Sequence, residues 1–112
     1  MTEKKIMADL KDIRYYYSRK SVLDGVLGTQ QSSAADKASL YGNAMIGAPP
    51  RLYDLYIGLY VMNNTQYGLA EQWGYSEIYI KVLNKKLKKY LLDILNDRKG
   101  GESQWNGAYR NS

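Results

Sequence analysis

Lysines recur at helical spacing in the segment from residue 77 to residue 96. Lys81 and Lys85 are four positions apart, and Lys88 and Lys89 follow, with apolar residues between them. At roughly 100° of rotation per residue, this pattern predicts a helix with one cationic side and one apolar side. Lysines on one side of a helix can neutralise the phosphates of nucleic acid. The first chemistry indicated by the sequence is therefore contact with a polyanion.

Residues near the start of this predicted helix can contact the edges of bases. Ile78 and Val82 are apolar residues on the cationic side, where the methyl group of thymine can be met in the major groove. Glu77 is repelled by phosphates, but it suits the positive end of the helix dipole and can accept from a cytosine amino group. The apolar side, which we expect to pack inward, comprises Ile80, Leu83, Leu87, Tyr90, Leu91 and Ile94.

A short helix and a tight turn precede this segment. A helix-turn-helix needs a small residue where its helices touch, glycine or a similar residue in the turn, and apolar residues that lock the pair together. Ala70 and Gly74, four positions apart, fill the first two requirements. The predicted apolar anchors are Leu69, Trp73 and Tyr75 near the turn, with Ile80 and Leu83 in the second helix.

The N-terminal part of the chain predicts two further helices. Apolar residues at positions 6, 10, 13 and 17 (Ile6, Leu10, Ile13 and Tyr17) predict a helix from Glu3 to about Leu23. Asp24-Gly25 and Gly28 indicate turns, and the small polar stretch 28–39 predicts a loop that enters a short helix at about 35–46. Gly47 and Pro49-Pro50 should end that helix.

A third helix should follow at once, because Pro50 suits a first helical turn. It covers 51–62, with a stripe of Leu52, Leu55, Tyr56, Leu59 and Met62. Thr65 is then expected to cap the short helix of residues 66–73, and Ser76 to cap the long helix.

These elements predict an all-α fold of four to five helices without a strand. We expect an N-terminal helical extension and loop over 1–48, a helix-turn-helix unit over 49–98 and a disordered polar tail over 99–112. Leu92 and Leu95 extend the apolar side of the last helix, which indicates packing on the N-terminal helix or on a second subunit.

Composition argues against catalysis. The chain has no cysteine and no histidine, so it lacks thiol nucleophiles, the usual general base and the usual zinc ligands. We expect no enzyme activity, no cofactor and no metal; Asp93 and Asp97 are interpreted as solvated carboxylates. A net charge of +5 favours an anionic partner. No signal peptide or membrane-spanning run is apparent, so we expect a cytoplasmic protein without membrane contact.

Residues 49–95, PPRLYDLYIGLYVMNNTQYGLAEQWGYSEIYIKVLNKKLKKYLLDIL, resemble region 4 of sigma-70-type factors. The shared layout is a helix, a Thr-initiated helix with Leu-Ala, a Gly-x-Ser turn and a long helix rich in Lys and Leu. Its small size, basic charge and added N-terminal helix make the chain similar to phage-encoded ArpU/RinA-type transcription regulators, which are associated with late-gene expression. Trp73 and Glu77 depart from the commonest pattern of the motif. The resemblance implies DNA contacts at Ser76, Glu77, Ile78, Lys81, Val82 and Lys85.

The sequence therefore predicts a sequence-specific regulator of phage late genes in the bacterial host cell. The helix at about 77–96 would enter the major groove of double-stranded DNA, and Lys81, Lys85, Lys88 and Lys89 would engage phosphates. Dimerisation or contact with host RNA polymerase would supplement the limited surface of one helix-turn-helix. The alternative is a helical protein–protein adaptor or phage assembly protein with no nucleic-acid role, in which the lysines only solubilise the helix.

Overall fold

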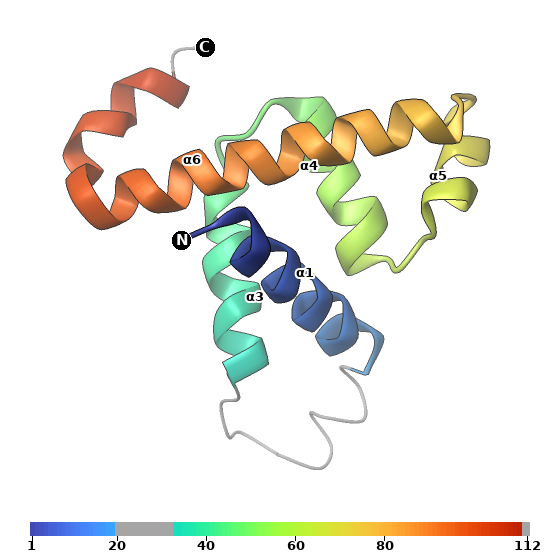
Figure 1. Ribbon diagram of the computed structural model, residues 1–112, viewed down its shortest axis with the longest axis horizontal. Coiled ribbons are helices and arrows are strands. Elements are labelled where there is room, and N and C mark those ends of the chain that lie inside the picture. Colours follow the sequence, from blue (N-terminus) through green and yellow to red (C-terminus); the bar gives the residue numbers. More distant parts are fainter. Residues whose placement is uncertain (20–32, 111–112) are drawn as a thin grey trace.

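The computed structural model describes residues 1–19 and 33–110, with side chains described as far as Asp97 in the last helix. Every regular element in this part of the chain is helical (Figure 1), which confirms the all-α prediction. The predicted turns at Asp24-Gly25 and Gly28 and the loop residues up to 32 lie outside the described residues. The elements are α1 (Glu3–Ser18), α3 (Ser33–Ala44), α4 (Pro50–Tyr56), the π-helical segment η1 (Ile57–Val61), α5 (Gln66–Trp73) and α6 (Glu77–Arg110).

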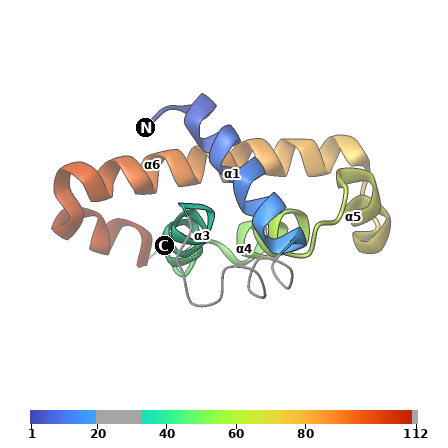
Figure 2. The ribbon, with the colours of Figure 1, turned by 90° about the horizontal axis from the view of Figure 1, so that it is seen from below.

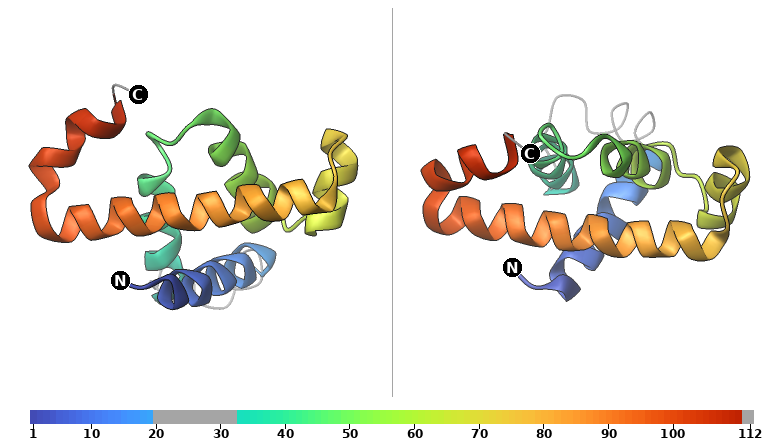
Figure 3. Two further views of the ribbon diagram at one scale, coloured as in Figure 1. Left: turned by 45° about the horizontal axis from the view of Figure 1, so that its top comes forward. Right: turned by 90° about the horizontal axis from the view of Figure 1, so that it is seen from above.

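The long helix α6 is the element against which the others pack. Contacts join it to α1, α3, α4 and α5, and Figure 3 shows it as a long bar with the remaining helices arranged along it. Seen from below, α1 crosses the middle of α6, while α5 lies at its N-terminal end (Figure 2). All six residues predicted for its inward side are buried in one core with residues of α1, α3, α4 and α5.

Helix α1 begins as its sequence predicts and ends earlier. The Thr2 hydroxyl oxygen accepts a hydrogen bond from the Lys5 backbone N–H at 3.2 Å, which caps the first turn. Ile6, Leu10 and Ile13 are buried, in agreement with their helical spacing. The helix stops at Ser18 instead of near Leu23, because the backbone of Arg19 (φ −115°, ψ 10°) leaves the helical region. Residues 20–23 of the predicted range lie outside the described residues.

Helix α3 begins and ends two residues before the predicted range of 35–46. Ser33 and Ala34 belong to the helix because Asp36 in the first turn complements the helix dipole and alanine favours helical structure. Beyond Ala44 the chain turns, and Ile46 is exposed. Pro50 then opens α4 in the first-turn position predicted for it.

The single helix predicted over 51–62 is divided into α4 and the wider π-helical turn η1. A π-helix closes i→i+5 hydrogen bonds, so it changes the direction in which later side chains point. Met62, placed on the inward stripe by the sequence, is consequently 67% exposed, and Tyr60 is buried. Gly58 permits the close approach of α5, since an added Cβ would lie 2.9 Å from Leu69 Cδ1.

The loop between η1 and α5 is held by α1. Asn63 adopts a left-handed backbone conformation (φ 63°), which asparagine tolerates better than most residues. The Arg14 side chain donates to Asn63 Oδ1 at 2.9 Å and to the Asn64 carbonyl oxygen at 3.2 Å. The Asn63 side chain donates back to the Arg14 carbonyl oxygen at 3.2 Å. The N-terminal helix thus fixes the segment from which α5 starts.

Helix α6 continues beyond its predicted end near Asn96. It reaches Arg110 and includes Gly100-Gly101, where the sequence predicts the start of a disordered tail. Each glycine costs about 1 kcal/mol relative to alanine in a helix, but no proline interrupts the segment, so a helix can form there. Figure 1 shows this last part of α6 turning back from the line of the rest. Among the described residues, no helix has both the length and the apolar character that crossing a bilayer requires.

Candidate nucleic-acid interface

Helices α5 and α6 form the predicted helix-turn-helix, and the two N-caps and the glycine turn occur at the residues predicted for them. The Thr65 hydroxyl oxygen accepts from the Gly68 N–H at 2.9 Å at the start of α5. At its end Gly74 has φ 74°, and the Tyr75 N–H donates to the Ala70 carbonyl oxygen at 2.9 Å, as in a Schellman C-cap. The Ser76 hydroxyl oxygen then accepts from the Tyr79 N–H at 3.1 Å at the start of α6.

The two helices are locked together by the small and apolar residues that the sequence assigns to that role. Leu69 and Ala70 of α5 and Ile80 and Leu83 of α6 are buried. Trp73 is partly buried against the core. Tyr75 is an exception among the predicted anchors: it is 40% exposed and contributes to the surface described below.

Gly74 provides a test of the turn. An added Cβ would meet no atom within 4 Å, so the cost of substitution arises from the left-handed backbone alone. We expect G74A to lower the free energy of unfolding by about 1–2 kcal/mol, and G74N to lower it less because asparagine tolerates this conformation. Urea denaturation of the three proteins measures both differences. Equal stability of G74A and the unsubstituted protein would contradict a left-handed turn.

The outward side of α6 presents a cationic face, which we define as Lys81, Lys85, Lys86 and Lys89 with Ile78 and Val82 among them. Ile78 is 73% exposed, and the Lys89 side chain is 78% exposed. Of the residues predicted to contact DNA, the structure therefore places Ile78, Lys81, Val82, Lys85 and Lys89 together at the surface. Lys86 belongs to this face although the sequence analysis did not name it; its helical position between Val82 and Lys89 is the signal that was available.

Three of the predicted site residues have other surroundings. Ser76 is engaged as the cap of α6 through its hydroxyl oxygen. Glu77 is exposed at the first turn, where its carboxylate lies 3.9 Å from the Lys81 ammonium. Lys88 is half-buried and not fully outward, because it borders a hollow shared with Met7 and Leu10 of α1. These residues lie at the margin of the cationic face, which is centred on Lys85 and Val82.

A shallow groove of about 470 Å³ runs along the C-terminal half of the cationic face. Val82 and Leu92 supply apolar surface, and Glu3 of α1 brings one carboxylate to its border. The other lining residues are Lys85, Lys86, Lys88 and Lys89. Such a combination of lysines and apolar surface can accommodate an anionic ligand that also carries apolar groups, as the edge of a nucleic acid does.

Arg51 and two aromatic rings lie beside the turn between α5 and α6. The guanidinium carbon of Arg51 lies 5.5 Å from the centre of the Trp73 ring and 5.2 Å from the centre of the Tyr75 ring. Tyr75 also pairs with Tyr79 in the first turn of α6, with ring centres 4.8 Å apart. This arrangement is not apparent from the sequence, because only the fold brings α4 against the turn.

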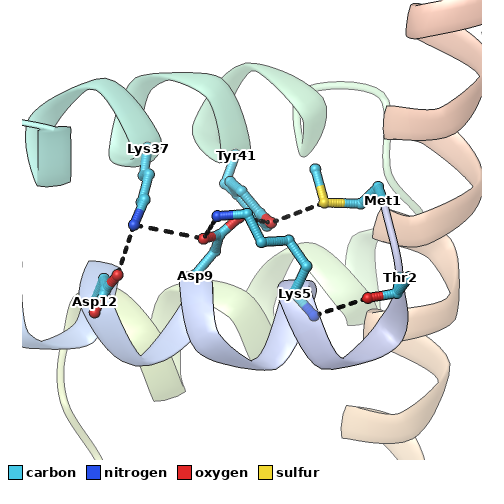
Figure 4. Close-up of polar contacts among 7 residues, drawn as sticks. All are labelled: Met1, Thr2, Lys5, Asp9, Asp12, Lys37 and Tyr41. Atoms are coloured by element: carbon cyan, nitrogen blue, oxygen red, sulfur yellow. Dashed lines mark hydrogen bonds and ion pairs between the residues drawn. The ribbon is translucent and has the colours of Figure 1, made fainter.

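A polar cluster joins α1 to α3, and we call it the Asp9 cluster (Figure 4). The Asp9 side chain is only 4% exposed. It accepts hydrogen bonds at 2.7 Å from Lys5 Nζ and at 2.7 Å from the Tyr41 hydroxyl, and Lys37 Nζ lies 3.6 Å away. Lys37 also pairs with the more exposed Asp12 at 2.6 Å. The cluster therefore balances the buried carboxylate with two cations.

Burial alone would raise the pKa of Asp9, but the hydrogen bonds from Lys5 and Tyr41 and the charges of Lys5 and Lys37 outweigh it and lower that pKa below its ordinary value. Burial and the neighbouring carboxylate raise the pKa of Tyr41, which keeps its proton. At neutral pH the cluster thus contains an ionised carboxylate and a neutral phenol. We interpret it as the link between α1 and α3.

Other tyrosines of the core are anchored at their hydroxyl groups. Tyr60 donates to Asn84 Oδ1 at 2.7 Å, and Tyr90 donates to the Ala44 carbonyl oxygen at 3.0 Å. Burial raises the pKa of Tyr60, although the bond to Asn84 opposes the shift. Within the described part of the chain, the buried Tyr56 hydroxyl has no hydrogen-bond partner. These tyrosines belong to the core and not to the candidate interface.

Among the described residues, no three acidic side chains come together in a way that could hold a metal ion. Comparison of the chain with protein-family models, with curated proteins and with solved structures finds no match. The candidate interface is therefore defined by its own geometry: a helix-turn-helix with a cationic face on its second helix and, beside its turn, an arginine that contacts two aromatic rings.

Proposed function

We propose that this protein is a sequence-specific DNA-binding transcription regulator that places the N-terminal half of α6 in the major groove. The observation that carries the proposal is the cationic face of α6. This face is presented by a helix-turn-helix in which Thr65 caps the first helix, Gly74 forms the turn and Ser76 caps the second helix. A helix of this kind packs on one side and turns its other side toward DNA. The resemblance to ArpU/RinA-type regulators supports a role in phage late-gene expression, in the cytoplasm of the host.

The lysines of this face are available to phosphates. Lys81 and Lys89 have acidic neighbours at 3.9 Å and 3.7 Å, respectively, and all four lysines are exposed. Exposed pairs of this kind contribute about 0–1 kcal/mol, so exchange of a carboxylate for a phosphate costs little. The field of the lysines also steers a polyanion toward α6.

Discrimination between sequences would come from the first turns of α6. Ile78 and Val82 are exposed and four residues apart, so they lie on one side of α6 and can contact thymine methyl groups. Glu77 can accept a hydrogen bond from a cytosine amino group. The pair of Glu77 with Lys81 also explains how an acidic residue is tolerated beside phosphates. Recruitment or positioning of host RNA polymerase, with or without a second copy of the chain, would convert binding into regulation.

The salt dependence of binding tests the electrostatic part of this proposal. Four phosphate contacts, from the four lysines of the cationic face (Lys81, Lys85, Lys86 and Lys89), give a slope of about −3.6 in a plot of log K against log salt concentration. The duplex is obtained by selecting random genomic fragments that the protein retains, and K is measured by fluorescence anisotropy. Failure to retain any fragment, or a slope near zero, would refute the proposal.

An adaptor that binds another protein is the second candidate. Its support is the exposure of the apolar and aromatic residues Ile78, Val82, Tyr75 and Tyr79. An adaptor would retain no DNA fragment in the selection above. A regulator would retain a subset with a common sequence, so the same experiment separates the two functions.

A further inference from the structure

Arg51 contacts two aromatic rings next to the turn of the helix-turn-helix. Its guanidinium group lies over the rings of both Trp73 and Tyr75, at 5.5 Å and 5.2 Å from their centres. Contacts of this kind contribute about 0.5–1 kcal/mol each at exposed sites. Two rings restrict the rotamers of a long side chain, so less conformational entropy remains to be lost when the guanidinium binds a ligand.

The charge of Arg51 is not matched by an ion pair within the part of the chain that the structure describes. Asp54 borders the same open hollow of about 530 Å³, together with Pro50, Trp73 and Tyr75, but no oxygen of Asp54 lies within ion-pair distance of Arg51. Arg51 is itself exposed. Contact with aromatic rings does not use up the five N–H donors of a guanidinium group, so those of Arg51 can donate to an anion.

The position of Arg51 relative to α6 decides which anion is relevant. Tyr75 connects it to Tyr79, which lies in the first turn of α6. On the helix, Tyr79 points to the flank opposite to Asn84 and Lys88, which border the hollow beside α1. Arg51 therefore flanks the cationic face on the side away from α1. A helix in a major groove about 12 Å wide has a sugar–phosphate backbone on each flank.

We propose that Arg51 is a phosphate-binding residue that contacts the DNA backbone on this flank, with Trp73 and Tyr75 as its positioning residues. The inference rests on the proposed DNA-binding function and adds a contact outside α6. Stacking of an unpaired base is disfavoured here, because the guanidinium already lies over both rings and Tyr79 occupies another side of Tyr75. Duplex DNA, which offers phosphates but no unstacked bases, is the partner that this geometry fits.

The test compares R51A and R51K with the unsubstituted full chain on the selected duplex. One lost phosphate contact should make the salt slope of R51A less steep by about 0.9 and reduce its affinity about tenfold at about 0.1 M salt. R51K retains the charge and should keep the slope, but it lacks the planar stack, so its affinity should fall several-fold. D54N should change the DNA affinity in the opposite direction, because removal of the carboxylate from the same hollow removes a repulsion of phosphates and should tighten binding.

Ethylation of the DNA phosphates locates the contact directly. With the unsubstituted protein, ethylation should interfere at a phosphate beyond those protected by α6, and R51A should lose the interference at that phosphate alone. Thermal unfolding of each variant checks the fold, and R51K serves if R51A does not fold. If R51A folds and shows the same salt slope and the same ethylation interference as the unsubstituted protein, the inference is overturned but DNA binding stands. If R51A does not fold, an unchanged DNA affinity of R51K overturns the inference in the same way. No binding by the unsubstituted protein would overturn both.

Discussion

Replacement of Lys81 and Lys85 by alanine should weaken the binding of duplex DNA about 100-fold at about 0.1 M salt and flatten the log-log salt slope by about 1.8. Both lysines belong to the cationic face in the N-terminal half of α6, and neither is buried. Each phosphate contact contributes about 0.9 to the slope, which corresponds to about tenfold in affinity per contact at this salt concentration. The loss should be similar for specific and random duplexes, because phosphate contacts carry no sequence information.

The same substitution should leave the fold almost unchanged. Alanine favours helical structure more than lysine does, and the exposed pair of Lys81 with Glu77 at 3.9 Å contributes little. The melting temperature of the double variant, measured by circular dichroism, should therefore stay within a few degrees. A sharp fall in melting temperature would contradict the assignment and make the two lysines structural.

R19A is the matched control for loss of positive charge. Arg19 is exposed at the C-terminal end of α1 and does not belong to the cationic face; its guanidinium carbon lies 5.6 Å from the centre of the Tyr15 ring. A general effect of net charge would weaken binding to the same degree in R19A as in K85A. A surface-specific interface requires a large effect for K85A and a small one for R19A, measured on the same duplex and at the same salt concentration.

The helix-turn-helix was predictable because its signals are local. Thr65, Gly74 and Ser76 act on backbone groups within a few residues of themselves, and the inward arc of α6 follows from helical periodicity. The local rule failed after η1, where one wider turn leaves Met62 at the surface. Nothing in the residue types of positions 57–61 distinguishes this turn from an α-helical one.

Features that depend on tertiary contact were not predictable from one sequence. Arg14 reaches Asn63 across 49 positions, and Tyr41 reaches Asp9 across 32 positions. The stack of Arg51 on Trp73 and Tyr75 likewise requires α4 to lie against the turn. Periodicity assigned residues to an inward or an outward side, but it could not state which distant residue each would meet.

These distant contacts give the N-terminal helix a role in the interface. Arg14 fixes the loop that starts α5, while Leu10 and Ile13 belong to the core that α6 completes. Helix α1 also borders the flank of α6 at Lys88. We therefore expect α1 to hold the helix-turn-helix in position, so that a loosened α1 would weaken DNA binding without removal of any DNA contact.

The Asp9 cluster is the link whose loss should loosen α1 most. D9N removes the buried carboxylate that accepts hydrogen bonds from Lys5 and Tyr41, and we expect a loss of about 2–3 kcal/mol of unfolding free energy at pH 7, because a hydrogen bond to a charged group contributes about 1.5–3 kcal/mol. Y41F removes one hydrogen bond to the carboxylate and should cost about 1–2 kcal/mol. Y56F is the matched control: Tyr56 is equally buried, but its hydroxyl has no partner among the described residues, so its loss should cost little.

The pH dependence of stability tests whether the charge of Asp9 causes the stabilisation by the Asp9 cluster. Because the pKa of Asp9 is lowered in the folded protein, the unfolded chain binds the proton at higher pH than the folded chain does. The stabilisation is therefore complete above the unfolded pKa of about 3.9 and is lost as the pH falls through the lower folded pKa. Urea unfolding from pH 7 to pH 2 should show this loss in the unsubstituted protein and less of it in D9N. Parallel curves would mean that the cluster holds α1 to α3 by shape alone, and that the two lysines contribute nothing through their charge.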